Sequence, residues 1–308
     1  MSSYSNFNVD LTNTNSSWTI LYHKIDEGAT VLDIGCSSGY FDEVLVRQKK
    51  CAVDGVEMDP ADAKRAKKIC RKVVEGNIES NDFPWDLIDQ KYDHILFIDV
   101  LEHLIDPART LQNVSKLLKE NGSILFSIPN MANGSVRLQL LQGNFDYEKE
   151  GLLDETHLHY YTDYTITKMI QVSKLKLTDI DFTTFDTPSS TIRTVMKSVG
   201  LASTPDFEKY LRSGTALIYQ YIGTVQVHGT SIALPGRMQA IKPKIDYEKQ
   251  IAEVQDDTRK VFKNLTNANG IINKQHAEIV SLKEELDILR NEPPFKKIKR
   301  TIKGIINR

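Results

Sequence analysis

Short apolar runs alternate with amphipathic stretches between Ala29 and Val227. Successive residues within the early runs are apolar, which is typical of strands that are covered by helices on both faces. This alternation predicts an α/β fold built around a mostly parallel sheet. Seven strands are expected, over residues 30–35, 51–58, 72–76, 92–99, 122–130, 174–182 and 216–227.

Helical periodicity and proline placement locate the helices. Pro60 and Pro107 each follow an Asp, and the first turn of a helix tolerates proline because its N–H needs no partner there. Asn121 and Gly122 then indicate a turn into the fifth strand. Helices are expected over residues 39–48, 60–70, 107–119 and 163–173, with a short one around Trp18–Lys24.

The other segments divide the chain further. Residues 1–28 form a polar N-terminal segment, and residues 29–227 form the α/β domain. Within that domain the polar, glycine-containing stretch 131–161 is expected to be an inserted loop or lid. Residues 228–246 contain prolines and a glycine but no periodicity, which predicts a linker.

A heptad repeat covers residues 247–291. Its a positions (251, 258, 265, 272, 279 and 286) and d positions (254, 261, 268, 275, 282 and 289) are apolar or Ala at ten of twelve places. This pattern predicts a coiled coil, and with it a homo-oligomer. Because Asn267, Asn269 and Gly270 weaken the middle of the repeat, a long helix folded back on the α/β domain is the alternative.

The C-terminal tail, residues 292–308, begins at two prolines that end the heptad helix. From Phe295 onward it interleaves five large apolar side chains with six basic residues and no acidic one. This pattern predicts a basic amphipathic helix suited to an anionic membrane surface. A solvated tail or a helix that docks on a partner is the alternative.

Composition and charge narrow the class of protein. The 308 residues are 40% hydrophobic and 26% charged, and 39 basic residues face 41 acidic ones for a net charge of -2. This composition argues against a disordered or membrane-embedded chain and against broad affinity for nucleic acid. The first residues lack the features of a secretory signal, and three cysteines are too few for a disulfide framework. We therefore expect a cytoplasmic protein, with peripheral contact at the inner face of the membrane as an option.

Residues suited to ligand binding gather at the ends of the first two strands. The stretch VLDIGCSSGYF runs from a buried strand into a tight turn at Gly35 and a helix that begins near Gly39. Gly35 allows the backbone to approach a ligand closely, and Gly39 allows the helix to begin beside it. Glu57 ends the second strand, where a carboxylate can accept hydrogen bonds from two ribose hydroxyls. The third glycine of a dinucleotide fingerprint is missing, so an NAD-dependent oxidoreductase is the least favoured class.

Over residues 25–185 the chain resembles the class I S-adenosylmethionine-dependent methyltransferases. VLDIGCSSG is similar to their first motif, GVEMDP to the acidic end of their second strand, and EGNIES to their adenine-binding stretch. The segment from YDHILFIDVLEHL to GSILFSIPN is similar to their fourth strand, the helix after it and their fifth strand. The resemblance implies a Rossmann-like, doubly wound sheet of seven mostly parallel strands, with S-adenosylmethionine as the cofactor.

The same resemblance implies roles for individual residues. The cofactor-binding residues it implies are Asp33, Gly35 and Gly39 around the methionine part, Glu57 on the ribose, Met58 against the adenine, Asn77 and Ile78 at the adenine edge, and Asp99 beside the sulfonium. The family often has Asp at position 77, and the amide oxygen of Asn can accept the same hydrogen bond. Glu102 and His103 match a Glu-His pair that organises the floor of the site in members acting on small molecules.

A second, narrower resemblance concerns GLLDETHLHYYT, residues 151–162. It is similar to a stretch in methyltransferases encoded with bacterial surface-polysaccharide genes: Asp154, Thr156 and His157 match, and His159 stands where Arg is frequent. A trailing coiled coil and a basic C-terminus also occur in enzymes of cell-envelope glycan assembly. The resemblance implies a sugar or glycan hydroxyl as the methyl acceptor.

Methyl transfer from a sulfonium requires the acceptor oxygen, the methyl carbon and the sulfur to lie in line. Because a sugar hydroxyl is a poor nucleophile, a base within hydrogen-bond reach is expected to accelerate transfer by about 10²–10⁴-fold. His157 is the first candidate for this base and His103 the second, and a purely structural role for His157 is the alternative. His157 and His159 would share one face of an extended segment, but no third ligand has suitable spacing, so no metal is expected. Ring-stacking candidates for the acceptor are Tyr160, Tyr161 and Tyr164.

Three functions are left open by the sequence. The first is an O-methyltransferase for a sugar hydroxyl in cell-surface glycan biosynthesis, held as an oligomer near the membrane. The second, a methyltransferase for a quinone, lipid or other small metabolite, shares every cofactor motif; a polar lid over 131–161 would favour the sugar, and an apolar tunnel the quinone or lipid. The third is a non-catalytic, cofactor-binding scaffold assembled by the coiled coil. The intact glycines and acids of the cofactor motifs argue against this third function.

Overall fold

A computed structural model describes residues 9–234, 247–291, 300 and 303 of the chain. It divides into two compact units, residues 1–240 and 241–308. Among the described residues, no helix is both long enough and apolar enough to span a bilayer.

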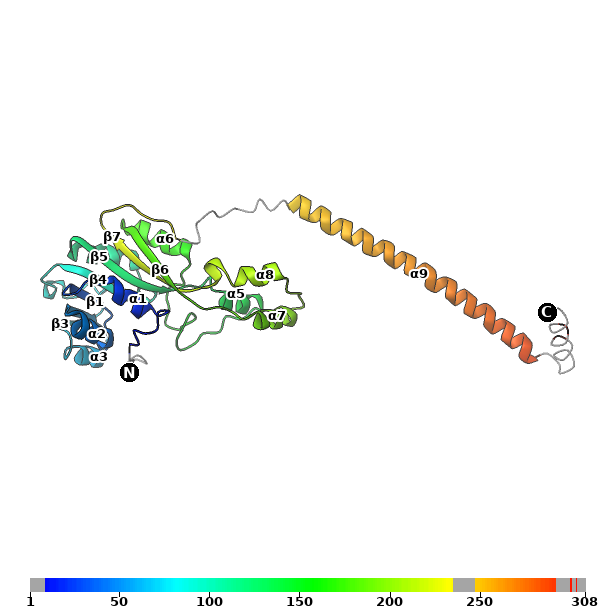
Figure 1. The fold of residues 1–308 in the computed structure, drawn as a ribbon, viewed down its shortest axis with the longest axis horizontal. Helices are drawn as coiled ribbons and strands as arrows, with labels where there is room; N and C mark the ends of the chain where they lie inside the picture. Colours follow the sequence, from blue (N-terminus) through cyan, green and yellow to red (C-terminus); the bar gives the residue numbers. More distant parts are fainter. Residues whose placement is uncertain (1–8, 235–246, 292–299, 301–302, 304–308) are drawn as a thin grey trace. The chain divides into compact units, whose positions relative to one another are not determined.

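Seven strands of the first unit form one sheet in the order β3-β2-β1-β4-β5-β7-β6 (Figure 1). Strands β1 to β5 run parallel, whereas β7 is antiparallel to both β5 and β6. The strands are β1 Thr30–Ile34, β2 Ala52–Glu57, β3 Lys72–Glu75, β4 Tyr92–Ile98, β5 Leu118–Pro129, β6 Lys176–Thr184 and β7 Ile218–Gln226. The predicted α/β fold with seven mostly parallel strands is confirmed.

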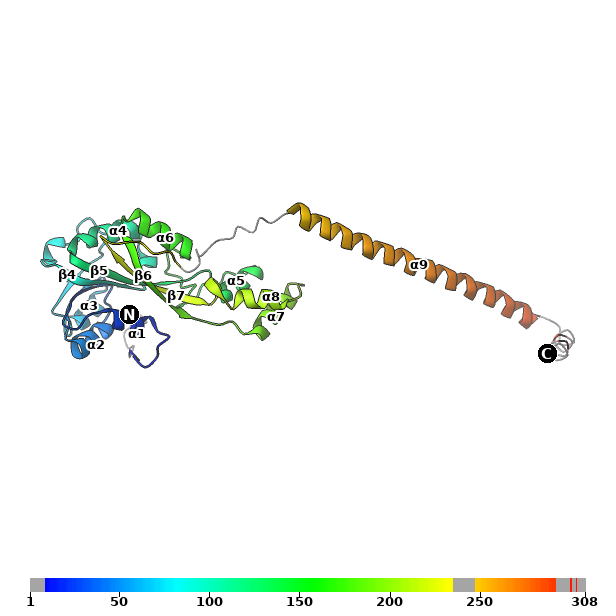
Figure 2. The ribbon, with the colours of Figure 1, turned by 45° about the horizontal axis from the view of Figure 1, so that its top comes forward.

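Helices cover both faces of this sheet, with α4 and α6 on one side and α1, α2 and α3 on the other (Figure 2). The helices of the first unit are α1 Ser17–Lys24, α2 Tyr40–Lys49, α3 Pro60–Ala66, α4 Pro107–Val114, α5 Gly134–Leu141, α6 Asp163–Val172, α7 Ser189–Ser198 and α8 Pro205–Leu211. Successive residues of β1 belong to different cores: Val31 packs with Leu21 of α1, and Leu32 with Leu111 of α4. Burial on both faces explains why the strands read as continuous apolar runs.

Two predicted helices are shorter in the structure. The helix expected over 107–119 ends at Val114, a 3₁₀ turn follows over Ser115–Leu117, and β5 begins at Leu118. Leu118 pairs with Tyr92 across an irregularity in the register, so residues 118–121 extend the strand instead of the helix. Helix α3 likewise ends at Ala66 and not at residue 70.

Helices α5, α7 and α8 are absent from the sequence prediction. Helix α5 lies inside the stretch 131–161 that was expected to be a loop, and α7 and α8 lie between β6 and β7. The three helices share a small core of their own, made by Leu138, Ile192, Met196 and Leu211. The carbonyl oxygen of Leu211 lies 2.6 Å from where a Cβ on Gly134 would be, so a side chain at position 134 would separate α5 from α8.

The first residues of the predicted linker contact the sheet. The backbone N–H of Ile232 donates to the carbonyl oxygen of Leu177, and the side chain of Leu234 is buried. Residues 235–246 of that linker lie outside the described residues, as do residues 1–8 of the N-terminal segment.

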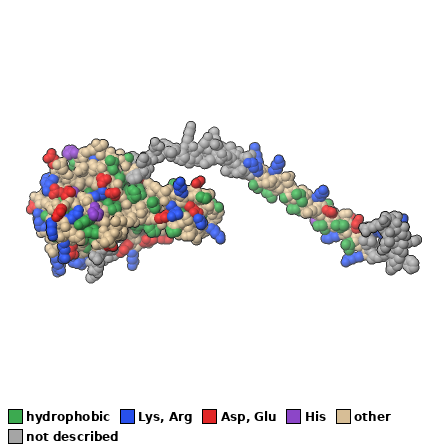
Figure 3. All heavy atoms as spheres, viewed as in Figure 1, with side chains coloured by type: hydrophobic (Ala, Val, Ile, Leu, Met, Phe, Trp, Pro, Cys, Tyr) green, Lys and Arg blue, Asp and Glu red, His purple; other side chains and the backbone are tan. Residues whose placement is uncertain are grey.

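The described part of the second unit is the 45-residue helix α9, Tyr247–Asn291. Figure 3 shows hydrophobic side chains in view along it. Nine large apolar side chains between residues 258 and 287 are exposed, and six of them occupy a or d positions of the heptad: Val261, Leu265, Ile272, Ile279, Leu282 and Leu286. The predicted membrane-binding tail, residues 292–308, lies outside the described residues except for Arg300 and Lys303.

Candidate active site

A cavity of about 590 Å³ opens at the carboxyl ends of β1, β2 and β3. Five of the eight predicted cofactor residues line it, together with His103: Gly35, Glu57, Met58, Asn77 and Ile78. In open parallel sheets, nucleotides bind beyond the carboxyl ends of the strands, because the loops and helix starts there present free backbone N–H groups. The cavity therefore has the position and the lining expected for the adenosine part of S-adenosylmethionine.

Glu57 is held in place by the backbone. Its Oε2 accepts from the N–H of Ser37 and its Oε1 from the N–H of Asp59, both at 2.8 Å. Each carboxylate oxygen offers a second lone pair, so the side chain can still accept hydrogen bonds from two ribose hydroxyls. The fixed carboxylate thus fits its predicted role.

The two motif glycines have different structural roles. Gly35 has a φ of +76°, and a Cβ there would lie 2.7 Å from Cγ2 of Val100, at the wall of the cavity. Gly39 has a φ of +81° and caps α2, and a Cβ there would lie 3.2 Å from the Cα of Ala66 in α3. Gly39 is not among the residues that line the cavity; it permits the close packing of α2 against α3.

Asp33 is buried beneath the site and does not line the cavity. Its pKa is raised well above the usual range by burial and by the neighbouring carboxyls of Asp42 and Glu57. Burial also raises the pKa of Asp42 to about 6, although hydrogen bonds from Cys70 and Asp33 oppose this shift. We infer that Asp33 and Asp42 share a proton near neutral pH, because two adjacent buried carboxyls cannot both ionise without large cost.

A second cavity of about 410 Å³ shares His103 with the first. Asp99 lines this second cavity and not the first. Its Oδ1 accepts hydrogen bonds from Oγ of Ser127 at 2.7 Å and from Nε2 of Gln220 at 2.8 Å, and its φ of +52° is unusual for a residue with a side chain. Asp99 therefore joins β4, β5 and β7 at the boundary between the two cavities.

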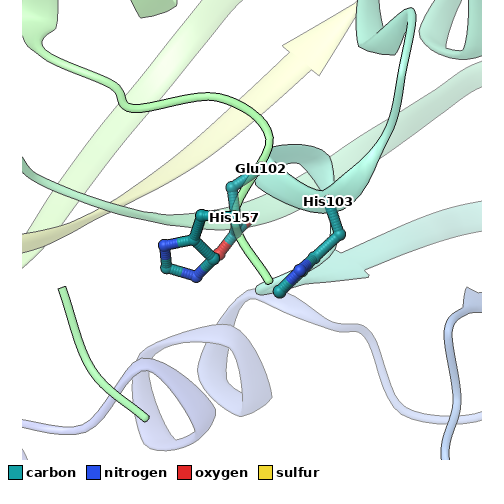
Figure 4. Close-up of side chains that lie close together, drawn as sticks. All are labelled: Glu102, His103 and His157. Atoms are coloured by element: carbon teal, nitrogen blue, oxygen red, sulfur yellow. The ribbon is translucent and has the colours of Figure 1, made fainter. Parts of the chain in front are cut away.

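Glu102, His103 and His157 form a cluster at this boundary (Figure 4). Their nearest ligand atoms all lie within 4.8 Å of one another, and Nε2 of His157 is 4.0 Å from Oε1 of Glu102. Burial raises the pKa of Glu102 well above its usual range, and burial and His103 lower the pKa of His157. Both shifts favour the uncharged forms of these two side chains.

The loop that carries His157 is attached to the turn after β4 through its backbone. That turn is a 3₁₀ helix over Leu101–His103, and the carbonyl oxygen of Glu102 accepts from the N–H groups of Leu158 at 2.9 Å and His159 at 3.0 Å. Nδ1 of His103 in turn lies 3.2 Å from the carbonyl oxygen of Thr156. These contacts bring together residues that are more than fifty positions apart in sequence.

Several residues of the second cavity were missed by the sequence analysis. Its aromatic side chains are Trp18, Phe185 and Tyr219, not the predicted stacking residues Tyr160, Tyr161 and Tyr164. Tyr161 is buried in the main core, and Tyr164 lies on α6. Trp18 comes from α1 and Tyr219 from β7, and no local pattern signals that these elements meet at the site.

Replacing Glu57 by Gln should weaken S-adenosylmethionine binding by about 10–100-fold. The amide of Gln is uncharged and offers one acceptor oxygen, whereas the carboxylate of Glu57 is charged and offers two. The matched control is Glu75→Gln, since Glu75 pairs with Glu57 in the neighbouring strand but does not line the cavity. Isothermal titration calorimetry measures both affinities. Equal affinity in the two variants would contradict the placement of the ribose.

Replacing Asp42 by Asn should flatten the pH dependence of stability. A carboxyl whose pKa is higher in the folded than in the unfolded chain loses its stabilising effect as the pH rises from the unfolded toward the folded value. Between about pH 4 and pH 7, we expect the free energy of unfolding to fall more in the wild type than in Asp42→Asn, by on the order of 2 kcal/mol. Urea denaturation at the two pH values measures this, with the half-buried neighbour Glu43→Gln as the control. Parallel curves for the wild type and Asp42→Asn would refute the prediction.

Comparison with known proteins agrees with this geometry. Ubiquinone biosynthesis O-methyltransferase of Acinetobacter baylyi is 29% identical over 136 residues, which are 40% of this chain and 57% of that enzyme. The enzyme of the same name from Coxiella burnetii is 32% identical over 106 residues, 34% of this chain and 45% of that one. The chain thus spans about half the length of the curated relatives it matches.

A putative methyltransferase of Bacillus halodurans, known from its crystal structure, is 12% identical and covers 70% of this chain and 99% of its own, with a TM-score of 0.46. The family described as "Methyltransferase domain" matches residues 10–179, more than half of the chain. That match includes the glycine turn, Glu57, the adenine edge and the Glu102–His103 pair. The chain therefore belongs to the methyltransferase-domain family.

Proposed function

We propose that the enzyme transfers the methyl group to an uncharged hydroxyl of a saccharide, in the biosynthesis of a surface glycan. The observation that carries this proposal is the lining of the second cavity, which is rich in hydrogen-bonding side chains around a few aromatic rings. The polar residues that line it are Asn13, Asn15, Ser16, Ser17, Asp99, Glu102, His103, Glu150, Asp154, His157, Thr183, Thr184 and Gln220. Sugars present several hydroxyls and flat apolar ring faces, which such a lining complements.

The charge of this cavity favours a neutral acceptor. Four of the described lining residues are acids, Asp99, Glu102, Glu150 and Asp154, and none of the described lining residues is Lys or Arg. A phosphate finds no cationic partner among these residues, and those acids that are ionised repel it. In this proposal the sugar ring of the acceptor lies in the second cavity, and any phosphate or lipid carrier attached to it stays outside that cavity.

The position of the cluster suits removal of a proton from the acceptor. Bound S-adenosylmethionine supplies a methyl group on a sulfonium, and the boundary between the two cavities is where an acceptor oxygen would meet it in line. His103 lines both cavities, and Glu102 and His157 line the second cavity beside it. His157 is the first candidate to receive the hydroxyl proton, since its lowered pKa leaves the imidazole unprotonated at neutral pH, and His103 is the second.

A quinone precursor is the second candidate acceptor. The curated relatives that support it are named ubiquinone biosynthesis O-methyltransferases. A phenol ring would contact Trp18 and Tyr219 in the second cavity. The many hydrogen-bonding side chains in the lining are the reason for placing this candidate second.

Transfer of radiolabelled methyl groups distinguishes the two acceptors. The purified full chain is incubated with labelled S-adenosylmethionine and, in parallel, with nucleotide sugars, lipid-linked glycans and quinone precursors. We expect label in a glycan fraction. Label only in the quinone fraction would replace the saccharide proposal with the second candidate.

Replacing His157 by Ala should lower kcat for the identified acceptor by about 10²–10⁴-fold while the affinity for S-adenosylmethionine stays within about twofold of the wild type. The reason is that His157 faces the second cavity and does not line the first. The exposed His23→Ala is the control, with kcat expected at the wild-type value. Unchanged turnover in His157→Ala would leave this imidazole with a structural role only.

We also propose that α9 pairs with the α9 of a second copy of the chain. Six of its nine exposed large apolar side chains fall on the a and d positions, which form one stripe along the helix. A helix with this stripe exposed to water gains stability from pairing, because each buried leucine or isoleucine contributes about 1.5–3 kcal/mol.

Replacing Leu265 and Ile272 together by Lys should convert the oligomer to a monomer, because the new charges lie on the apolar stripe. Replacing Lys263 and Ala277 by Glu, at outward f positions of the same helix, should leave the oligomer intact. Light scattering coupled to size-exclusion chromatography measures the mass of both full-length variants. A monomeric wild type would rule out pairing through α9.

A further inference from the structure

The carboxylate of Glu102 is the most unusual polar group of the site. The residue is 1% exposed, and neither Oε1 nor Oε2 has a hydrogen-bond partner among the described residues. A buried carboxyl without partners lowers the stability of the fold by several kcal/mol. The ionised form is an unsolvated charge, and the neutral form has unsatisfied hydrogen-bonding groups. Such a cost persists where a ligand that the chain itself does not supply satisfies the group.

The imidazole of His103 has the backbone support that metal-binding histidines have. Nδ1 of His103 lies 3.2 Å from the carbonyl oxygen of Thr156, so a hydrogen on Nδ1 can donate to this oxygen and leave Nε2 with a free lone pair. A backbone carbonyl that fixes the tautomer in this way is the usual support for a metal-binding histidine. Thr156 is itself fixed, since its N–H and its hydroxyl both donate to Oδ1 of Asp154.

We propose that Glu102, His103 and His157 bind one divalent first-row transition-metal ion at the boundary between the two cavities. Their ligand atoms lie within 4.8 Å of one another, and donors around a tetrahedral zinc ion lie about 3.4 Å apart, so rotation of the side chains closes the site (Figure 4). Two imidazoles and one carboxylate suit Zn²⁺ or Co²⁺, whereas Mg²⁺ and Ca²⁺ prefer sites made of oxygen ligands.

Three protein ligands leave a coordination position for the acceptor. Glu102, His103 and His157 all line the second cavity, so an acceptor hydroxyl in that cavity can reach the ion. Coordination lowers the pKa of a hydroxyl. The hydroxyl proton then passes to water in the second cavity, the O–CH₃ bond forms as the S–CH₃ bond breaks, and S-adenosylhomocysteine is released. In this form of the enzyme, His157 is a ligand, and water takes the place of His157 as the proton acceptor.

This catalytic role rests on the proposed function, but binding of the ion does not. Binding is therefore tested without turnover. The full-length chain is freed of metal with a chelator and titrated with Co²⁺, whose visible absorption reports tetrahedral or five-coordinate nitrogen and oxygen ligation. We expect one Co²⁺ per chain, displaced by one equivalent of Zn²⁺.

Glu102→Gln and His103→Asn should each weaken Co²⁺ binding by more than about 100-fold, because each removes a direct ligand. The matched control is His159→Asn: His159 is two residues from His157, but its Nε2 lies 3.2 Å from the carbonyl oxygen of Ile105, and it is outside the cluster. The control should bind Co²⁺ within about twofold of the wild type. Thermal unfolding followed by circular dichroism, measured in chelator, verifies that each variant is folded.

The absence of Co²⁺ binding to the wild type, or equal binding by Glu102→Gln, His103→Asn and wild type, would overturn the metal site. Loss of binding in the ligand variants alone supports it. The labelled-methyl assay is run separately with and without chelator: transfer that persists in chelator would overturn the catalytic role of the ion and leave the proposed function standing. Metal binding without transfer to any acceptor would overturn the proposed function and leave the metal site standing.

Discussion

The carbonyl oxygen of Glu102 accepts two backbone hydrogen bonds, from Leu158 and His159. Which side chains line the second cavity depends on this attachment. A parallel sheet gathers the ends of its strands at one edge, but the loop between α5 and α6 is under no such constraint. The hydrogen bonds fix that loop to the turn after β4. As a result the imidazole of His157 lies beside the carboxyl of Glu102, and both face the second cavity.

The two cavities are built in different ways. The cofactor cavity is formed by consecutive βα units, so its residues come from the segment between Ile34 and Leu104. The second cavity combines residues from α1, from the loop before α6 and from β6 and β7. Insertion of β7 between β5 and β6, antiparallel to both, places Gln220 beside Asp99. The same cofactor half can therefore serve different acceptors when the surrounding elements change.

Buried acids are concentrated where the cavities meet the sheet. Asp33 and Asp42 lie behind the glycine turn, and Glu102 lies at the boundary between the cavities. Each of these acids has a raised pKa because burial disfavours its charge. Such groups lower the stability of the fold, and proteins keep them mainly where binding or chemistry requires them. The metal ion that we propose would favour the ionised form of Glu102, because a nearby cation stabilises a carboxylate.

The amino-acid sequence by itself determined the α/β fold, the order of the strands along the chain and most of the cofactor cavity. These features rest on local signals: apolar runs for buried strands, a glycine at positive φ for the turn, and an acid at the end of β2. Only the tertiary structure placed Trp18, Tyr219 and Gln220 in the acceptor cavity, because contacts between distant segments leave no periodic pattern. It also showed that Glu102, in the 3₁₀ turn after β4, is the third member of a cluster with His103 and His157. The sequence shows the chemistry of each side chain, but whether a carboxyl is buried without partners depends on what packs around it.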